Sequence, residues 1–198
     1  MRSAHLFESH LDPEGKNGYF NRENPAAQGG GNKTMGRMGM SVTFRFAQPE
    51  DTGLIFTFIK GLAEYEKMTD QVVADEATLR DWIFEKGKAE VLFAVADGKE
   101  VGFALFFYNF STFLGRAGLY LEDLFVLPEQ RGFGYGKALL VKLAQLARER
   151  GCGRLEWACL DWNRPSIDFY LSLGARSMDE WTTYRLTGET LSRLAGEE

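Results

Sequence analysis

The fold is decided by the stretch Leu119-Tyr120-Leu121-Glu122-Asp123-Leu124-Phe125-Val126-Leu127-Pro128-Glu129-Gln130-Arg131-Gly132-Phe133-Gly134-Tyr135-Gly136-Lys137. Its first half is an apolar run that predicts a buried strand. Pro128 ends that strand, because proline has no N–H for the hydrogen-bond ladder. Alternating glycines follow, and an amphipathic helix begins after them. A glycine loop that leads into a helix leaves several N–H groups at the positive end of the helix dipole, so the stretch predicts an anion site, with phosphate as the usual anion.

The spacing of the glycines separates this loop from two better-known phosphate loops. A dinucleotide fingerprint needs Gly-x-Gly-x-x-Gly, and Gly136 comes one position too early for it. A nucleoside-triphosphate loop needs Gly-x-x-x-x-Gly-Lys-Ser/Thr, but Arg131 stands at the first glycine and Ala138 follows Lys137. What remains is Arg-x-x-Gly-x-Gly between a strand and a helix. A glycine-rich turn without a ligand stays open as the structural alternative.

Size and composition narrow the class of protein. The 198 residues suffice for one globular domain, and the formal net charge of -5 disfavours nucleic acid as a partner, because phosphate backbones recruit lysine and arginine. Cys152 and Cys159 fit neither a zinc ribbon nor a redox pair. The chain has no apolar run long enough for a membrane span and no secretory signal pattern, so we expect a cytoplasmic protein without a membrane partner.

The first forty residues differ in composition from the rest. Residues 1–40 are rich in glycine and polar residues, and their apolar residues recur with neither the helical nor the strand periodicity. This composition predicts a disordered or loosely attached tail before a domain over residues 41–198. Both histidines, His5 and His10, lie in this tail. The domain therefore lacks histidine, which argues against Ser-His-Asp or Cys-His catalysis and against a metal site. Its acids and bases must be carboxylate, tyrosine, lysine, cysteine or water.

Periodicity predicts alternating strands and helices around the central stretch, and hence an α/β fold with a mixed, partly parallel sheet. We expect a hairpin turn at Asp97-Gly98 between two apolar runs. The expected strands cover residues 42–46, 90–96, 101–110, 119–126, 154–160 and 182–186. The expected helices cover residues 49–65, 75–83, 135–150 and 163–173, with a short one from residue 189.

Two spaced motifs resemble one family. Arg131-x-x-Gly134-x-Gly136 after a strand is similar to the acetyl-CoA signature of the GNAT superfamily of N-acetyltransferases, and a second match is residues 163–170, Asn-Arg-Pro-Ser-Ile-Asp-Phe-Tyr, followed by Leu-Gly-Ala. Within the superfamily, residues 119–123 and 163–166 resemble the diamine (spermidine/spermine) and thialysine acetyltransferases. The resemblance covers residues 42–194. It implies a GNAT-like sheet with splayed strands, transfer of acetyl from acetyl-CoA to a small cationic amine, and a homodimer.

The resemblance also implies the cofactor side of the site. Acetyl-CoA would lie between the strand that ends at Val126 and the strand over residues 154–160, its pantetheine arm pairing with backbone as an added strand does. Tyr170 resembles the family's general acid, which protonates the departing thiolate; a phenol with a pKa near 10 carries that proton at neutral pH. The residues implied to bind the cofactor are Leu124, Phe125, Val126, Arg131, Gly132, Phe133, Gly134, Tyr135, Gly136, Lys137, Asn163 and Tyr170.

On the substrate side, Glu122 resembles the carboxylate that positions the amine and takes its proton, directly or through water. Tyr65, Glu66, Asp123 and Tyr184 fall where the diamine enzymes line their cationic groove. Neighbouring strand residues point to opposite faces, so Glu122 and Asp123 can share a pocket only if a bulge intervenes, and the family carries a bulge hereabouts.

Two departures from the polyamine enzymes touch this substrate side. Phe113 and Tyr184 stand where tryptophans are expected, and the Asp97-Gly98 turn is shorter than the loop of the animal enzymes. Two other functions remain as alternatives: a non-catalytic acyl-CoA-binding or regulatory module, and an acetyltransferase for protein or peptide amines. The presence of Tyr170 and Glu122 argues against a non-catalytic module. An acetyltransferase for protein or peptide amines would require an open groove in place of a narrow acidic pocket.

Overall fold

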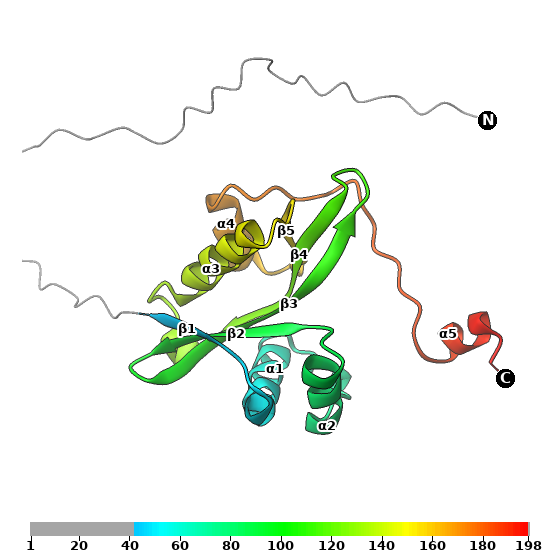
Figure 1. The fold of residues 1–198 in the computed structure, drawn as a ribbon, viewed down its shortest axis with the longest axis horizontal. Helices are drawn as coiled ribbons and strands as arrows, with labels where there is room; N and C mark the ends of the chain where they lie inside the picture. Colours follow the sequence, from blue (N-terminus) through cyan, green and yellow to red (C-terminus); the bar gives the residue numbers. More distant parts are fainter. Residues whose placement is uncertain (1–41, 198) are drawn as a thin grey trace, which may run out of the picture. The chain divides into compact units, whose positions relative to one another are not determined.

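The computed structural model describes residues 42–197, which form one sheet with helices on both of its faces (Figure 1). The strands lie in the order β1 (Thr43–Phe46), β2 (Glu90–Ala96), β3 (Lys99–Ser111), β4 (Arg116–Val126) and β5 (Leu155–Trp157). The main helices are α1 (Thr52–Glu66), α2 (Glu76–Arg80), α3 (Tyr135–Glu149), α4 (Arg164–Ser172) and α5 (Gly188–Ala195). Single turns are η1 (Pro49–Asp51), η2 (Thr69–Gln71), η3 (Asp81–Glu85) and η4 (Pro128–Gln130). The tail expected over residues 1–40 lies outside the described residues.

The sheet is mixed, as the alternation of strands and helices predicts. The pairs β1–β2, β2–β3 and β3–β4 are antiparallel, and β5 runs parallel to β4. The hairpin between β2 and β3 turns at Asp97 and Gly98, whose φ angles are 50° and 73°. Two central residues with positive φ twist the chain in the sense that the flanking strands require. The predicted hairpin is therefore confirmed.

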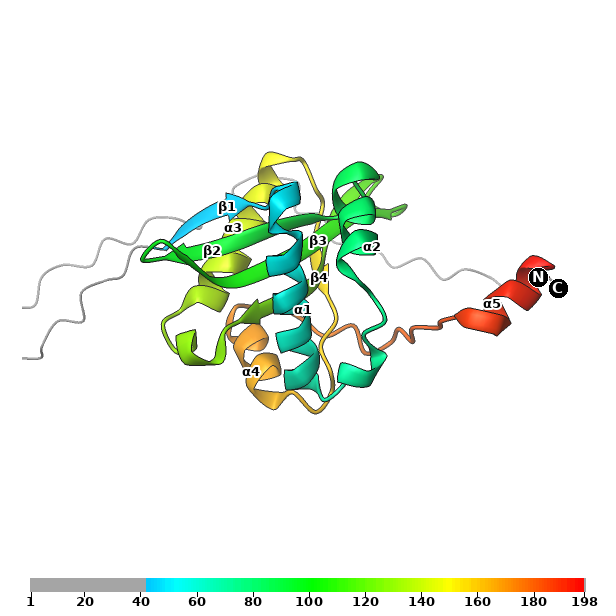
Figure 2. The same ribbon diagram turned by 90° about the horizontal axis from the view of Figure 1, so that it is seen from below.

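Each face of the sheet has its own apolar core. Helices α3 and α4 lie on one side of the sheet, and α1 and α2 on the other (Figures 1 and 2). On the α1 side, Phe58 of α1 contacts the rings of Phe93, Phe103 and Phe125, with centroids 5.2–6.4 Å apart. On the α3 side the helix buries a leucine stripe against the strands: Leu139, Leu140, Leu143 and Leu146. Because β3 serves both cores, it is apolar on both faces, as its sequence indicates.

The last two strands separate early. β5 pairs with β4 only where Leu119–Leu121 meet Leu155–Trp157, so the strand expected over residues 154–160 is shorter than predicted. The chain at Ala158–Leu160 leaves the ladder. Among the described residues, β4 has no strand beside that edge from Glu122 to Val126, which gives the splayed strands that the resemblance implies.

The strand predicted over residues 182–186 is wrong for this structure. Residues 181–187 form no strand, and Trp181 and Tyr184 are 73% and 90% exposed. A strand needs a neighbour for its N–H and C=O groups, and local alternation cannot supply one. The helix expected from residue 189 is present as α5.

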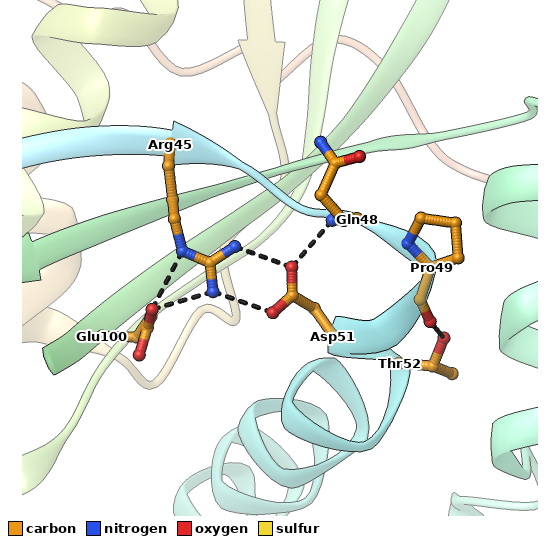
Figure 3. Close-up of polar contacts among 6 residues, drawn as sticks. All are labelled: Arg45, Gln48, Pro49, Asp51, Thr52 and Glu100. Carbon is orange, nitrogen blue, oxygen red and sulfur yellow. Dashed lines mark hydrogen bonds and ion pairs between the residues drawn. The ribbon is translucent and has the colours of Figure 1, made fainter.

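A charged cluster ties β1 to the start of α1 (Figure 3). The Arg45 guanidinium donates to both carboxylate oxygens of Asp51, at 2.7 and 2.8 Å, and to Glu100 of β3. The backbone N–H of Gln48 also donates to Asp51, at 2.7 Å. The Arg45 hydrogen bonds hold the pKa of the Asp51 carboxyl below its ordinary value. The cluster fixes where α1 leaves the sheet, and the far end of α1 reaches the site described next.

Candidate active site

A β-bulge in β4 brings two neighbouring carboxylates to one face of the sheet. Phe106 lies opposite Leu121 and Leu105 lies opposite Asp123, so Glu122 has no partner of its own. Because two residues of the bulged strand then oppose one on β3, Glu122 and Asp123 share a face instead of alternating. The bulge expected from the resemblance is confirmed.

A cavity of about 730 Å³ opens where β4 and β5 separate. Its walls are the end of α1, the second half of β4, the glycine loop, the chain after β5, and α4. Fifteen of the predicted site residues line it: Tyr65, Glu66, Glu122, Asp123, Leu124, Phe125, Val126, Arg131, Gly132, Gly134, Tyr135, Gly136, Lys137, Asn163 and Tyr170.

Two predicted residues are not among those that line the cavity. Phe133 lies in the glycine loop with 44% of its surface exposed and its ring 6.0 Å from that of Tyr135. Tyr184 lies in the exposed segment after α4. The expectation that both contribute to the site depended on loop and strand positions that a motif match does not fix.

The cavity also has wall residues that are not among the predicted site residues, although the strand expected over residues 154–160 includes them. Ala158, Cys159 and Leu160 line it directly after β5. A usable signal existed, since ligands of α/β sheets commonly bind at the carboxyl ends of parallel strands. Burial raises the pKa of the Cys159 thiol, so this thiol is held in its protonated form.

The glycine loop presents backbone donors at one end of the cavity. Gly132 and Gly134 have φ angles of 81° and 87°, and Gly134 is the N-cap of α3. These conformations direct the chain so that N–H groups at the start of α3 lie at the positive end of its dipole. Lys137 adds a cation on the same wall. This end of the cavity suits a phosphate or diphosphate.

The edge of β4 adds a backbone acceptor. The N–H of Leu127 donates to the Val101 carbonyl of β3 at 3.0 Å. Because a trans peptide points its N–H and C=O in opposite directions, the Val126 carbonyl is directed away from β3, toward the side where β5 has departed. There it accepts a hydrogen bond from Arg131 Nε at 3.1 Å. The backbone groups that β4 turns to this side therefore face the gap left by β5, and one of them, the Val126 carbonyl, already accepts from Arg131.

Tyr170 lies on α4, against the far wall. Asn163 caps this helix by accepting from the Ser166 N–H at 3.4 Å, and Pro165 occupies the first turn, where its missing N–H costs nothing. The Tyr170 ring packs against Trp157 at 5.0 Å. Burial, with smaller contributions from neighbouring groups that include Glu66, raises the pKa of Tyr170 to about 12. The phenol keeps its proton at neutral pH and can act as a donor.

Three carboxylates gather near the bulge. Burial, with the neighbouring charges of Glu122 and Glu66, raises the pKa of Asp123 to about 6. Burial also raises the pKa of Glu66, at the end of α1. Within residues 42–197 none of the three forms an ion pair. A cation that enters this end of the cavity would relieve their mutual repulsion.

A sequence model of the acetyltransferase (GNAT) family matches residues 58–175, more than half of the chain. The chain belongs to the GNAT family and is an N-acetyltransferase. Its match to thialysine N-epsilon-acetyltransferase of Sus scrofa is 40% identical over 169 residues, covering 79% of this chain and 99% of that protein.

A second curated protein and a solved structure are also similar to this chain. The L-ornithine N5-acetyltransferase of Arabidopsis thaliana is 44% identical over 93 residues, which is 47% of this chain and 41% of that protein. Among solved structures, an integron cassette protein of Vibrio cholerae superposes with a TM-score of 0.67 at 32% identity, covering 79% of this chain and 99% of that one. The GNAT fold is thus established by both sequence and structure.

Two features are absent from the part of the chain that the structure describes. None of its helices is long and apolar enough to cross a membrane. No group of three or more His, Cys, Asp or Glu side chains in this part of the chain is arranged to hold a metal ion.

The left-handed conformation of Gly134 gives a stability test of the loop. In Gly134→Ala the new Cβ meets no atom within 4 Å, so the cost is backbone strain, about 1–2 kcal/mol in the free energy of unfolding. Gly136→Ala is the matched control: this glycine is helical, its Cβ would make ordinary 3.8 Å contacts, and we expect a neutral effect or a gain of about 0.5–1 kcal/mol. Urea denaturation of both variants measures the difference. Equal effects would contradict the left-handed turn.

Proposed function

We propose that this enzyme transfers the acetyl group of acetyl-CoA to a primary amine of a small cationic substrate. The observation that carries the proposal is one cavity with two chemically different ends. One end offers helix N–H groups and Lys137 to an anion, and the other offers three unpaired carboxylates to a cation. The buried phenol of Tyr170 lines the same cavity.

The residues of the splayed edge fit acetyl-CoA. The amides of residues 131–136 would receive the diphosphate, with Arg131 and Lys137 as nearby cations. The outward backbone of Leu124 and Val126 would pair with the pantetheine arm in the manner of an added strand. The thioester of acetyl-CoA supplies an activated acetyl group.

The acid–base steps fall to the residues near the bulge. Glu122 and Asp123 hold the ammonium form of the substrate, whose unperturbed pKa of about 10.4 keeps it protonated at neutral pH. Glu122, directly or through a water, accepts the proton that the amine must lose before its lone pair can attack. Tyr170 donates its phenolic proton to the departing thiolate sulfur, so the leaving group departs as a thiol. After the attack the nitrogen must lose a second proton, and the Tyr170 phenolate left by the donation takes that proton, directly or through water. The amide and the thiol then form with every proton accounted for.

The relatives support an amine with a short cationic chain. Two of the matching proteins are tyramine N-feruloyltransferases of Nicotiana tabacum. Others are named for three kinds of amine that differ from tyramine: thialysine, L-ornithine and spermidine or spermine. All three kinds of substrate carry a primary amine and a second charged nitrogen. The three carboxylates of Glu66, Glu122 and Asp123 are suited to such a substrate because they can neutralise more than one positive charge.

An amine panel tests the proposal. Purified protein is incubated with acetyl-CoA and, separately, with thialysine, ornithine, lysine, spermidine, tyramine and a lysine-containing peptide, and free thiol release is followed. We expect turnover with at least one small amine that carries a second positive charge. Acetyl-CoA binding without turnover of any amine would favour the non-catalytic module, and turnover of the peptide alone would favour a protein acetyltransferase.

We also propose a homodimer. Large apolar side chains are exposed after α4: Met178, Trp181, Tyr184, Leu186, Leu191 and Leu194. Exposure of this many apolar side chains in one segment is typical of an interaction surface. Sedimentation equilibrium is expected to give twice the chain mass of 22.3 kDa, and a single-chain mass at all concentrations would contradict the dimer.

Replacement of Tyr170 separates chemistry from binding. Tyr170→Phe removes the phenolic proton and keeps the ring that packs on Trp157, so we expect turnover to fall by about 100-fold or more. The dissociation constant for acetyl-CoA, measured by calorimetry, is expected to stay within about twofold, less than 0.5 kcal/mol. If affinity and turnover fall together, Tyr170 has a structural role instead.

The carboxylate cluster gives a pH prediction with a defined sign. A raised pKa means that Asp123 is neutral below about pH 6, so kcat/KM for the amine is expected to fall as the pH drops below 6. Glu122→Gln removes a neighbouring negative charge, which lowers the Asp123 pKa and should move the acidic limb to lower pH. Asp123→Asn should abolish that limb.

Glu64→Gln is the matched control for these profiles, because Glu64 is an exposed carboxylate of α1 outside the cavity. Its profile should coincide with that of the wild type. An acidic limb that stays at the same pH in both Glu122→Gln and Asp123→Asn would show that another group controls it.

A further inference from the structure

The side chain of Arg131 is held by three contacts inside the cavity. Its guanidinium carbon lies 4.6 Å above the centre of the Tyr65 ring and 5.3 Å from that of Phe125. Its Nε donates to the Val126 carbonyl at 3.1 Å. A guanidinium over an aromatic face is attracted to the negative face of the ring. The arginine of the glycine loop is therefore fixed to the end of α1 as well as to β4.

The hydroxyl of Tyr65 engages the opposite wall. It donates to Asn163 Oδ1 at 3.1 Å. Asn163 is only 6% exposed, and the same oxygen accepts the Ser166 N–H that caps α4. Since α4 carries Tyr170, one tyrosine on α1 contacts both the arginine of the loop and the cap of the helix with the phenol.

We propose that Tyr65 is a positioning residue for the acetyl-CoA side of the site: its ring holds Arg131, and its hydroxyl holds the Asn163 cap of α4. This inference rests on the proposed function, and it assigns Tyr65 a role different from the amine contact implied by the resemblance. Through these two contacts, Tyr65 sets the separation between the glycine loop and the helix that carries Tyr170.

The charges argue against an amine contact at this ring. A substrate ammonium stacked on the face of Tyr65 that holds Arg131 would lie beside a permanent positive charge. The carboxylates of Glu122 and Asp123 offer that ammonium a better position on β4. The hydroxyl of Tyr65 already has a buried acceptor, so it has no need of a substrate partner.

Two substitutions divide the roles of Tyr65. Tyr65→Phe keeps the ring under Arg131 and loses the bond to Asn163, whereas Tyr65→Leu loses both. Tyr108 provides the matched control: it is a half-exposed tyrosine of β3 outside the cavity, and its hydroxyl also donates to one side chain, Glu90, at 3.3 Å. Calorimetric binding of coenzyme A and steady-state kinetics with the best amine of the panel are measured for wild type, Tyr65→Phe, Tyr65→Leu and Tyr108→Leu.

The two Tyr65 variants should differ in a characteristic way. Tyr65→Leu is expected to weaken coenzyme A binding about 3- to 30-fold, the range of a cation–π contact. Tyr65→Phe should bind coenzyme A within twofold of wild type and lower kcat, because α4 loses a restraint. The amine KM should stay within twofold in both variants, and Tyr108→Leu should match wild type in all three constants. A merely structural role would move every constant together.

A double-mutant cycle with Arg131→Lys tests the contact itself. Lysine keeps the charge and loses the planar group that lies on the ring, so the losses of affinity in Tyr65→Leu and Arg131→Lys should not add in the double variant. Full additivity would overturn the proposal, as would an increase in amine KM at unchanged coenzyme A affinity. If the wild type itself binds no coenzyme A, the proposed function fails, whereas wild-type binding that Tyr65→Leu leaves unaltered defeats only this inference.

Discussion

The site depends on the separation of β4 from β5 after Leu121. Up to that residue the two strands satisfy each other's backbone groups, and beyond it β4 continues to Val126 without a strand on that edge among the described residues. Buried N–H and C=O groups require partners, so an open edge inside a protein is costly unless something occupies it. In this structure the Val126 carbonyl receives Arg131 Nε. The proposed pantetheine arm would use the same edge, which links the splay of the sheet directly to the choice of cosubstrate.

The bulge in β4 gives this edge its second property. If the strand were regular, Glu122 and Asp123 would point to opposite faces and the acidic end of the cavity would hold one carboxylate fewer. With the extra residue, both reach the cavity that Tyr170 lines. The same short strand therefore runs from carboxylates that attract a cation to a glycine loop that attracts an anion. In the proposed reaction, this polarity sets the direction in which the amine and acetyl-CoA approach each other.

Much of the fold could be predicted from the sequence because its signals are local. The apolar run before Pro128, the glycines of the loop and the leucine stripe of α3 each define a backbone conformation without reference to distant residues. The length of β5 and the strand expected over residues 182–186 were not predictable in the same way, because a strand exists only where a neighbour accepts its hydrogen bonds. The bulge in β4 is defined by how β4 pairs with β3, and no pattern within the β4 sequence reveals that pairing.

In the site, as in the fold, features set by local sequence were predictable and features set by distant residues were not. All but one of the predicted site residues in the two motifs line the cavity. The exception is Phe133, a loop side chain whose direction the motif does not determine. The sequence placed Tyr65 in the site but did not reveal which residues it contacts. Its partners Arg131 and Asn163 lie 66 and 98 positions further along the chain. Cys159 was missed because its place in the cavity depends on where β5 leaves the sheet.

The central claim is that the open edge of β4 and the glycine loop together hold acetyl-CoA. A crystal structure of the protein with coenzyme A tests it most directly. The account predicts the diphosphate on the amides of residues 131–136, the pantetheine arm along the backbone of Leu124–Val126, and the sulfur beside the phenolic oxygen of Tyr170. Coenzyme A bound elsewhere, with no contact between its diphosphate and the glycine loop, would contradict it.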